Sequence, residues 1–232
     1  MQQNFGGNVK IFNDDCMNVM KEMPDSCIDF VMTDIPYDEV NRDSGGLRNL
    51  DKGGADVMTF DLHDFLHELL RITKNSVCIF CGRRQFSDIY IYIGDNTDFG
   101  KWSTRPIVWE KTNPSPMNGD KIYLSGTEFA VWAKKGGAKT FNAFCKNTVF
   151  RYPNGSSKVH PTEKNHDLLR ELILDNTNVG DVVFDPCMGS GSSLLVALEN
   201  DRKAVGCELS KEWSDIAKKR IDDFQKATSL WY

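Results

Sequence analysis

The 232-residue sequence has no long hydrophobic run, and its start has no charged region followed by an apolar stretch. It therefore offers neither a membrane span nor a secretory signal. It is not basic either, because its net charge of −5 argues against a protein that simply coats nucleic acid. Seven cysteines, an odd number, do not suggest a disulfide framework. We expect a cytoplasmic protein in a reducing environment, with no membrane partner.

Zinc-ligand spacing is also missing. Cys78 and Cys81 form a CxxC pair, but no second pair follows at the spacing that zinc sites use. The pair lies in the strand-like run SVCIFCG, where alternation places the two side chains on opposite faces of a sheet. We interpret both as core or incidental cysteines and expect no metal.

Charge is unevenly distributed along the chain. Residues 101–164 carry 11 Lys or Arg and 4 Asp or Glu, a net charge of +7, whereas the rest carries 17 basic and 29 acidic residues, a net charge of −12. A basic segment in an acidic protein indicates a face that meets an anion. A solvated lysine-rich surface explains the same counts equally well.

Strand-like and helix-like hydrophobic patterns alternate along the chain. Strands are expected at Val9–Asn13, Ile28–Asp34, Ser76–Gly82, Arg105–Lys111, Thr127–Lys135, Asp181–Cys187 and Lys203–Leu209. Helices are expected at Met17–Met23, Asp61–Thr73, Asn165–Asn176, Ser192–Asn200 and Lys211–Gln225. This predicts one α/β domain over residues 1–232, with a mainly parallel sheet and helices on both faces. The stretches Tyr37–Thr59 and Thr112–Gly126 fit neither pattern, and long loops of this kind are usually functional or disordered.

A glycine loop, residues 185–193, follows a buried strand in the run DVVFDPCMGSGSS. Gly189 and Gly191 let backbone approach a ligand, and the helix that begins at Ser192 favours negative charge at its start. Glu208 ends the next strand, where its carboxylate can accept hydrogen bonds from both hydroxyls of a ribose. This unit predicts a site for an adenosine-bearing cofactor.

A dinucleotide would be an alternative cofactor for the same unit. The third glycine of the dinucleotide motif is missing, because Leu194 stands three residues after Gly191. Asp185 also follows the strand directly, where its carboxylate would repel a pyrophosphate but suits the ammonium of a methionine moiety. The loop therefore fits a methionine-derived cofactor better.

The tetrapeptide Asp34-Ile35-Pro36-Tyr37 ends the strand IDFVMTD. With it the sequence resembles the amino-methyltransferases of DNA, whose catalytic motif is Asp/Asn/Ser-Pro-Pro-Tyr/Phe/Trp. The order DIPY, HPTEK (160–164), DPCMGSGSS (185–193) resembles the beta group of that family. The similarity extends from Asn13 to about Lys219 and is weakest in residues 38–60 and 112–158.

The resemblance implies a Rossmann-like methyltransferase fold, with S-adenosyl-L-methionine as cofactor and DNA as substrate. The expected reaction is direct methyl transfer to N6 of an adenine that is flipped out of the duplex. Residues 38–60 and 112–158 would recognise the target sequence. The family also leaves open a homodimer and a cognate restriction endonuclease as partners.

The chemistry of the reaction explains the tetrapeptide. The exocyclic amine of adenine is a poor nucleophile because its lone pair is delocalised into the ring. The carboxylate of Asp34 and the carbonyl of Ile35 would accept its two N–H bonds and stabilise the charge that develops during transfer. Pro36 stiffens the turn, and Tyr37 would stack on the flipped base.

Two residues depart from the family pattern. Ile35 stands where the first proline is usual, so we expect a less rigid turn. Cys187 replaces the aromatic residue that helps to wall the cofactor, so we expect a looser pocket.

The resemblance also implies which residues bind the cofactor. Lys164 would meet its carboxylate, and Thr162 would cap the helix that follows. Asp15 and Cys16 align with a segment that contacts its adenine. The full expected set is Asp15, Cys16, Asp34, His160, Thr162, Lys164, Asp185, Pro186, Cys187, Met188, Gly189, Ser190, Gly191, Ser192, Ser193, Glu208 and Leu209.

The basic segment would meet double-stranded DNA. Phosphate contacts set affinity and register, and we expect Lys111 and Lys121 among them. Trp109 and Trp132 lie in the same segment, but core positions on strands explain them better.

Two other functions remain open, and a third is discounted. A cytosine-N4 methyltransferase would more often carry Ser in place of Asp34. A cytosine-C5 enzyme needs a nucleophilic Pro-Cys, and Pro186-Cys187 lies in the cofactor loop instead. A homologue that binds cofactor or nucleic acid without catalysis is the alternative from another class.

Overall fold

The computed structural model describes residues 7–37, 58–116, 119–155 and 163–229. Its strands are β1 (Val9–Phe12), β2 (Ile28–Asp34), β3 (Thr73–Cys81), β4 (Trp102–Lys111), β5 (Thr127–Lys135), β6 (Val149–Tyr152), β7 (Val182–Asp185) and β8 (Lys203–Cys207). Its helices are α1 (Cys16–Glu22), α2 (Leu62–Ile72), α3 (Arg83–Asp95), α4 (His166–Asn176), α5 (Ser192–Glu199) and α6 (Lys211–Ser229).

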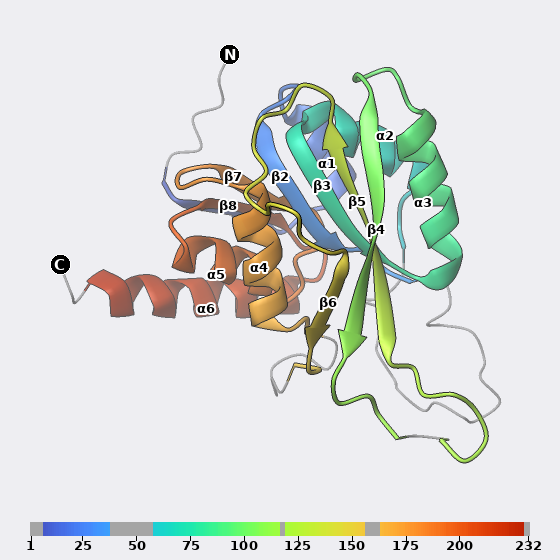
Figure 1. Cartoon of the computed structure of the whole chain (residues 1–232). Helices are drawn as coiled ribbons and strands as arrows, with labels where there is room; N and C mark the ends of the chain where they lie inside the picture. The colour runs from blue at the N-terminus through green and yellow to red at the C-terminus, as the bar shows by residue number, and fades with distance from the viewer. Residues whose placement is uncertain (1–6, 38–57, 117–118, 156–162, 230–232) are drawn as a thin grey trace.

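All eight of these strands form one sheet in the order β1-β8-β7-β2-β3-β5-β4-β6 (Figure 1). Strand β5 pairs antiparallel with both β3 and β4, and every other neighbouring pair is parallel. Only β5 therefore runs against the rest. The predicted α/β fold with a mainly parallel sheet is confirmed.

Helices cover both faces of the sheet (Figure 1). One hydrophobic core lies between the sheet and α1, α2 and α3, and a second lies between the sheet and α4, α5 and α6. Cys81 belongs to the first core and Cys78 to the second, as their alternation along β3 predicts. Trp109 is 2% exposed in the second core, which confirms the core position expected for it.

Two elements have no counterpart among the expected ones. Helix α3 contains the run Ile89–Ile93, in which Ile and Tyr alternate as they do in strands. It is nevertheless a helix because Ile89 and Ile93, four residues apart, lie on one side of it and are fully buried. Strand β6 has only four residues, and its pairing with β4, 41 positions away, leaves no local signal in the sequence.

The described part of the chain contains no helix that is both long and apolar enough to cross a lipid bilayer. Within the same residues no group of three or more His, Cys, Asp or Glu side chains is arranged to hold a metal ion.

Candidate active site

Four carboxylates line the edge of the sheet where the parallel strands end. Asp15 follows β1, Glu208 follows β8, Asp185 ends β7 and Asp34 ends β2. These four strands are neighbours in the order β1-β8-β7-β2. The carboxylates therefore span three inter-strand spacings, roughly 14 Å. An acidic edge of this length suits an elongated ligand that carries positive charge.

Glu208 is bound to the glycine loop by backbone hydrogen bonds. Its Oε2 accepts from the N–H of Gly189 at 3.0 Å, and its Oε1 accepts from the N–H of Ser210 at 2.8 Å. The side chain is half-buried, so part of the carboxylate is accessible to a ligand. Gly189 has φ of +51°, and a side chain there would meet no atom within 4 Å. The space beside Gly189 is therefore open.

Gly191 marks the point where the loop becomes helix α5. Its φ is +80°, and a Cβ atom there would lie 2.9 Å from the Cβ of Ala217 on α6. Both the conformation and the close approach require glycine. The start of α5 is thereby held against α6, beside the ends of β7 and β8.

Asp185 lies beneath the loop and is 5% exposed. It accepts hydrogen bonds from the N–H of Cys187 at 3.1 Å and from the hydroxyl of Ser193. Burial raises the pKa of this carboxyl to about 7, although both hydrogen bonds work in the opposite direction. A cation that binds nearby would favour the ionised form, which fits the ammonium expected there.

The serines of the glycine loop bind other parts of the protein. Arg220 of α6 donates to the carbonyl and to the hydroxyl of Ser190, both at 2.9 Å, and Ser192 donates to Glu163. Arg220 also donates to Glu163 at 2.8 Å. The side chains of Ser190, Ser192 and Ser193 are therefore occupied, and these residues can reach a cofactor through their backbone.

The other predicted cofactor residues take several positions. Asp15 caps α1 by accepting from the N–H of Met17 at 2.8 Å, Cys16 is buried at the start of α1, and Cys187 is half-buried in the glycine loop. Leu209 is 57% exposed beside Glu208. Pro186 and Met188 are buried within the loop. His160, Thr162 and residues 38–57 lie outside the described residues.

A second group of side chains, which we call the Asp34 cluster, contains Asp34, Tyr37, Lys111, Glu128 and Lys164. The ammonium of Lys164 lies 2.6 Å from Oδ2 of Asp34 and 2.9 Å from Oε2 of Glu128. It also donates to the hydroxyl of Tyr37 at 3.3 Å. Tyr37 in turn donates to Oδ1 of Asp34 at 2.9 Å. The ammonium of Lys164 therefore faces this cluster, with two hydrogen bonds and two ion pairs, and not the glycine loop as its expected contact with the cofactor carboxylate implies.

Glu128, at the start of β5, is the member of the cluster that sequence reasoning missed. Its Oε1 lies 2.6 Å from the ammonium of Lys111, whose side chain is only 15% exposed. This ammonium also lies over the ring of Trp109. The expected phosphate contact from Lys111 needs correction, because its charge is paired inside the protein. Lys121, by contrast, is exposed.

Burial and charge shift the pKa values in the cluster in different directions. Burial raises the pKa of Asp34 even though Lys164 opposes it. Burial also works against the charge of Glu128, but Lys164 and Lys111 outweigh it and lower the pKa to about 2. For Lys164, burial is outweighed by Asp34, Tyr37 and Glu128, which hold the pKa well above its ordinary value. The two lysines therefore keep Glu128 ionised at neutral pH, whereas for Asp34 the ion pair with Lys164 only partly offsets the effect of burial.

The turn after Asp34 is firmly anchored, contrary to the looser turn expected from Ile35. The side chain of Ile35 is 1% exposed in the core, and its N–H donates to the carbonyl of Phe80 at 3.1 Å. Proline has no N–H and could not form this bond. Gln85, 1% exposed on α3, donates to the carbonyl of Pro36 at 2.9 Å and accepts from the N–H of Gly82 at 2.8 Å. Sequence reasoning missed Gln85 together with α3.

The residues at the sheet edge fit S-adenosylmethionine. A half-buried carboxylate at the end of β8 suits a ribose, the open space beside Gly189 admits a ligand next to backbone, and the row of carboxylates suits the sulfonium and ammonium charges. The Asp34 cluster continues the same edge at β2. A methyl donor that lies along the edge would therefore end beside Asp34.

Known sequences and structures agree with this geometry. Residues 28–219 match the sequence model of the N6/N4 DNA methylase family. The Type II methyltransferase M2.DpnII of Streptococcus pneumoniae is 26% identical over 240 residues, which cover 91% of this chain and 89% of the relative.

Two solved structures share the fold. The complex of M1.HpyAVI with S-adenosylmethionine has a TM-score of 0.70 and 28% identity, and the match covers 91% of this chain and 99% of that one. The cytosine-N4-specific PvuII DNA methyltransferase has a TM-score of 0.69 over 91% of this chain and 86% of that one. At 17% identity the second likeness concerns the fold alone.

Proposed function

The chain belongs to the DNA methylase family and is an S-adenosylmethionine-dependent DNA methyltransferase, and we propose that its target is N6 of adenine in double-stranded DNA. The observation that supports this target is the tetrapeptide beginning at Asp34. Its first residue is a carboxylate at the end of β2, next to Tyr37 and on the same edge as the glycine loop. A carboxylate is a strong acceptor for the N–H bonds of an exocyclic amine.

Asp34 accepts one N–H of the target amine, and the carbonyl of Ile35 accepts the other. Each carboxylate oxygen has two lone pairs, so Asp34 can bind the amine and keep its ion pair with Lys164. Lys164 favours the charged form of Asp34, in which both of its oxygens accept hydrogen bonds, against the effect of burial. Glu128 positions Lys164 from the opposite side.

The bound cofactor supplies a methyl group that is activated by its sulfonium. The chain contributes Glu208 for the ribose, Asp15 and Cys16 near the adenine, and the glycine loop for close backbone approach. Most of the remaining acceleration comes from alignment of amine and methyl. Tyr37 stacks on the flipped base, and its own hydrogen bond to Asp34 fixes the position of its ring.

The partners and the setting extend this proposal. The DNA is double-stranded and is contacted by residues 38–60 and 112–158, which act as target-recognition segments of a single domain. A homodimer and a cognate restriction endonuclease are the protein partners consistent with the family. The enzyme works in the cytoplasm.

Incubation of the purified protein with methyl-labelled S-adenosylmethionine and duplex DNA tests the target. After digestion to nucleosides, we expect the label in N6-methyladenine. Label in N4-methylcytosine would overturn the adenine assignment and keep the enzyme class. No incorporation, with cofactor binding intact, would support the non-catalytic alternative.

A further inference from the structure

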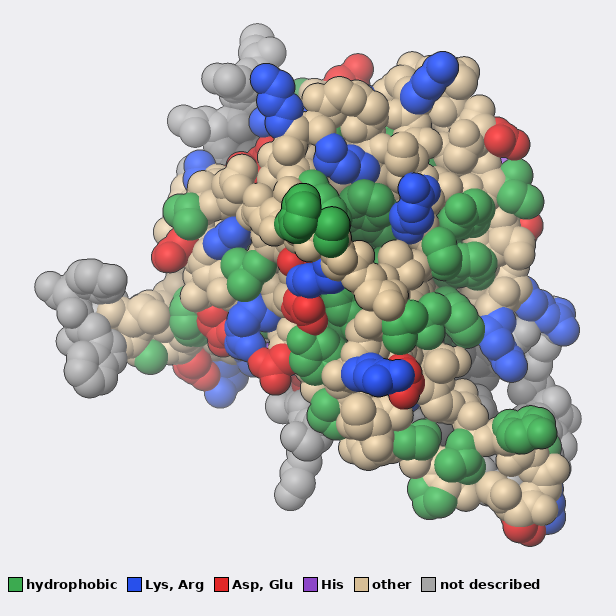
Figure 2. All heavy atoms as spheres, viewed as in Figure 1, with side chains coloured by type: hydrophobic (Ala, Val, Ile, Leu, Met, Phe, Trp, Pro, Cys, Tyr) green, Lys and Arg blue, Asp and Glu red, His purple; other side chains and the backbone are tan. Residues whose placement is uncertain are grey.

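A pocket lies away from the sheet edge that carries the candidate active site. It has a volume of about 500 Å³ and is lined by the first half of β4, the second half of β5, the loop 136–148 and the end of α4. Because Lys111 ends β4 and Arg105 stands six residues earlier, the two regions are roughly 20 Å apart along the strand. The volume is within the range of small-molecule sites. Figure 2 shows hydrophobic side chains with Lys and Arg side chains beside them on the face that carries α4.

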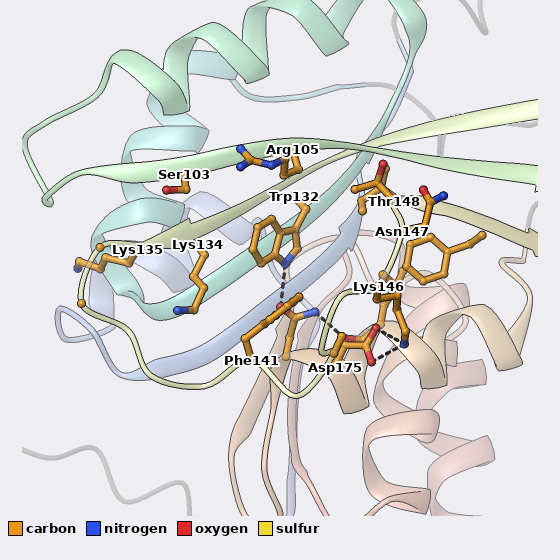
Figure 3. Close-up of a pocket in the computed structure, with 17 residues that line it drawn as sticks. Ser103, Arg105, Trp132, Lys134, Lys135, Phe141, Lys146, Asn147, Thr148 and Asp175 are labelled. Carbon is orange, nitrogen blue, oxygen red and sulfur yellow. Dashed lines mark hydrogen bonds and ion pairs between the residues drawn. The ribbon is translucent and has the colours of Figure 1, made fainter.

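The pairing of β4 with β5 decides which side chains face this pocket. Arg105 lies opposite Trp132, and Ser103 lies opposite Lys134, so these four side chains share one face of the sheet. Lys135 belongs to the other face, where its ammonium lies over the ring of Trp102 in the first core. Arg105 and Lys134 are therefore the strand-borne cations of the pocket (Figure 3).

These two cations are not compensated by carboxylates. Arg105 donates to the carbonyl of Thr104 at 2.7 Å, and Lys134 donates to the carbonyl of Ala138. Within the described residues neither forms an ion pair. The one carboxylate that lines the pocket, Asp175, lies 2.6 Å from Lys146. The pocket therefore has a positive surplus on its strand side, which suits an anion.

An aromatic surface lies beside these cations (Figure 3). Phe141 packs against Trp132 with ring centroids 5.4 Å apart, and it is 45% exposed. The next residue, Asn142, fixes this position by donating to the carbonyls of Leu174 and Thr177, both at 2.9 Å. Phe141 therefore offers a free ring face on a segment that is already ordered.

We propose that this pocket is a second ligand site, for a nucleotide, with the base stacked on Phe141 and the phosphate bound by Arg105 and Lys134. An aromatic ring beside two cations is the arrangement that binds nucleotides without base specificity. The nucleotide is either free or part of a nucleic-acid strand. The pocket is separate from the Asp34 cluster, its β5 and loop residues belong to the segment 112–158 that is proposed to contact DNA, and the proposal does not depend on which base is methylated.

Calorimetric titration of the full chain tests the proposal, with saturating S-adenosylmethionine present so that the cofactor site is filled. The probes are thymidine 5′-monophosphate and a thymidine hexanucleotide, neither of which contains adenine. We expect saturable binding of at least one probe. Binding of the mononucleotide identifies a free nucleotide as sufficient, and binding of the hexanucleotide alone identifies a strand as the source. No saturable binding of either probe overturns the proposal.

Matched variants locate the binding. Phe141→Ala should raise Kd about tenfold, whereas Phe144→Ala, three residues away and 94% exposed outside the pocket, should not change it. Lys134→Gln should weaken binding by several-fold, and Lys139→Gln, exposed on the loop that follows β5 and absent from the pocket lining, should not. All four variants should keep wild-type affinity for S-adenosylmethionine, because the pocket lies away from the glycine loop. Equal effects of Phe141→Ala and Phe144→Ala would place the ligand elsewhere and overturn the site.

Discussion

The two ends of the carboxylate edge hold their acids in opposite ways. In the glycine loop, Asp185 and Glu208 are held by backbone N–H groups and a hydroxyl, which are neutral. In the Asp34 cluster, Asp34 and Glu128 are held by the ammonium groups of Lys164 and Lys111. Burial raises the pKa of Asp185 to about 7 against its hydrogen bonds, and it also raises the pKa of Asp34 against Lys164, whereas Lys164 and Lys111 lower the pKa of Glu128 to about 2.

This difference matches what each end must do. A loop that receives a cationic cofactor gains from a carboxylate that is not already neutralised by the protein. An acceptor for a nearly neutral amine is more effective when it is charged, and Lys164 favours the charged form of Asp34 against the effect of burial. The carboxylates of the glycine loop are therefore left for a cationic ligand to neutralise. The carboxylates of the Asp34 cluster are already paired with lysines of the protein.

The largest effect should follow from removal of the acceptor. Asp34→Ala is expected to lower methyl transfer by about 100- to 1,000-fold, because charge on the amine is no longer stabilised. Cofactor affinity should stay within about twofold of wild type, since the carboxylate faces Lys164 and Tyr37. Label incorporation and calorimetry measure the two quantities. Asp34→Asn, which keeps the shape, is the control for packing. Weaker cofactor binding with normal turnover at saturating cofactor would mean that Asp34 binds the cofactor and is not the acceptor for the target amine.

Removal of the Glu128 carboxylate should show how much the ion pairs of the Asp34 cluster contribute to stability. Glu128→Gln leaves two buried ammonium groups with one carboxylate and should cost about 3 kcal/mol of unfolding free energy at pH 7. The pKa of Glu128 is depressed to about 2, so its contribution is full above about pH 4.5 and is lost as the pH falls toward 2.

Urea unfolding at several pH values measures this contribution. The difference in unfolding free energy between wild type and Glu128→Gln should therefore become smaller as the pH is lowered. Glu110→Gln is the matched control on the neighbouring strand, because Glu110 pairs with the exposed Arg151 and should contribute at most about 1 kcal/mol. Equal losses for the two variants would show that Glu128 is not a buried ion partner.

The sequence predicts one end of the edge better than the other, for a physical reason. The glycine loop and Glu208 form one strand–turn–helix–strand unit, so their relation is visible within about 25 residues. The Asp34 cluster joins β2, β4, β5 and the segment before α4, and Glu128 lies 94 positions from Asp34. The antiparallel insertion of β5 between β3 and β4 brings them together, and no local pattern encodes that order.

Glu208→Ala tests the glycine-loop end of the carboxylate edge. We expect Kd for S-adenosylmethionine to rise about 10- to 100-fold, with little change in turnover at saturating cofactor, because charge-assisted hydrogen bonds to the ribose are lost. Glu212→Ala, exposed in the first turn of α6, should bind like wild type. Unchanged affinity in folded Glu208→Ala protein would remove Glu208 from the ribose site.

Asp185→Asn should produce a pH dependence of opposite sign to that of Glu128. The folded-state pKa of about 7 lies above the ordinary value of 3.8, so the folded protein holds the proton more tightly than the unfolded chain. Wild-type stability without cofactor should then fall as the pH rises from about 4 to about 7. The asparagine variant should lack this decline and gain about 1–2 kcal/mol at pH 8. Thermal unfolding from pH 4 to 8 measures it, and a parallel decline in both proteins would refute the assignment.

The smallest effect separates two lysines that the sequence alone treats alike. Lys121 is exposed on the loop between β4 and β5, next to Ile122 and Tyr123, which are 64% and 102% exposed, whereas Lys111 is paired with Glu128. If Lys121 contacts a phosphate, Lys121→Gln should weaken DNA binding a few-fold and flatten the salt dependence by about one unit of slope. Lys111→Gln should leave that slope unchanged and lower stability, because it removes a partner of Glu128.

Fluorescence anisotropy with labelled duplexes between low and moderate salt distinguishes the two lysine variants. A weaker salt dependence of DNA binding for Lys111→Gln would mean that the ion pair between Lys111 and Glu128 opens when DNA binds. The Asp34 cluster would then also depend on its ligand for charge compensation.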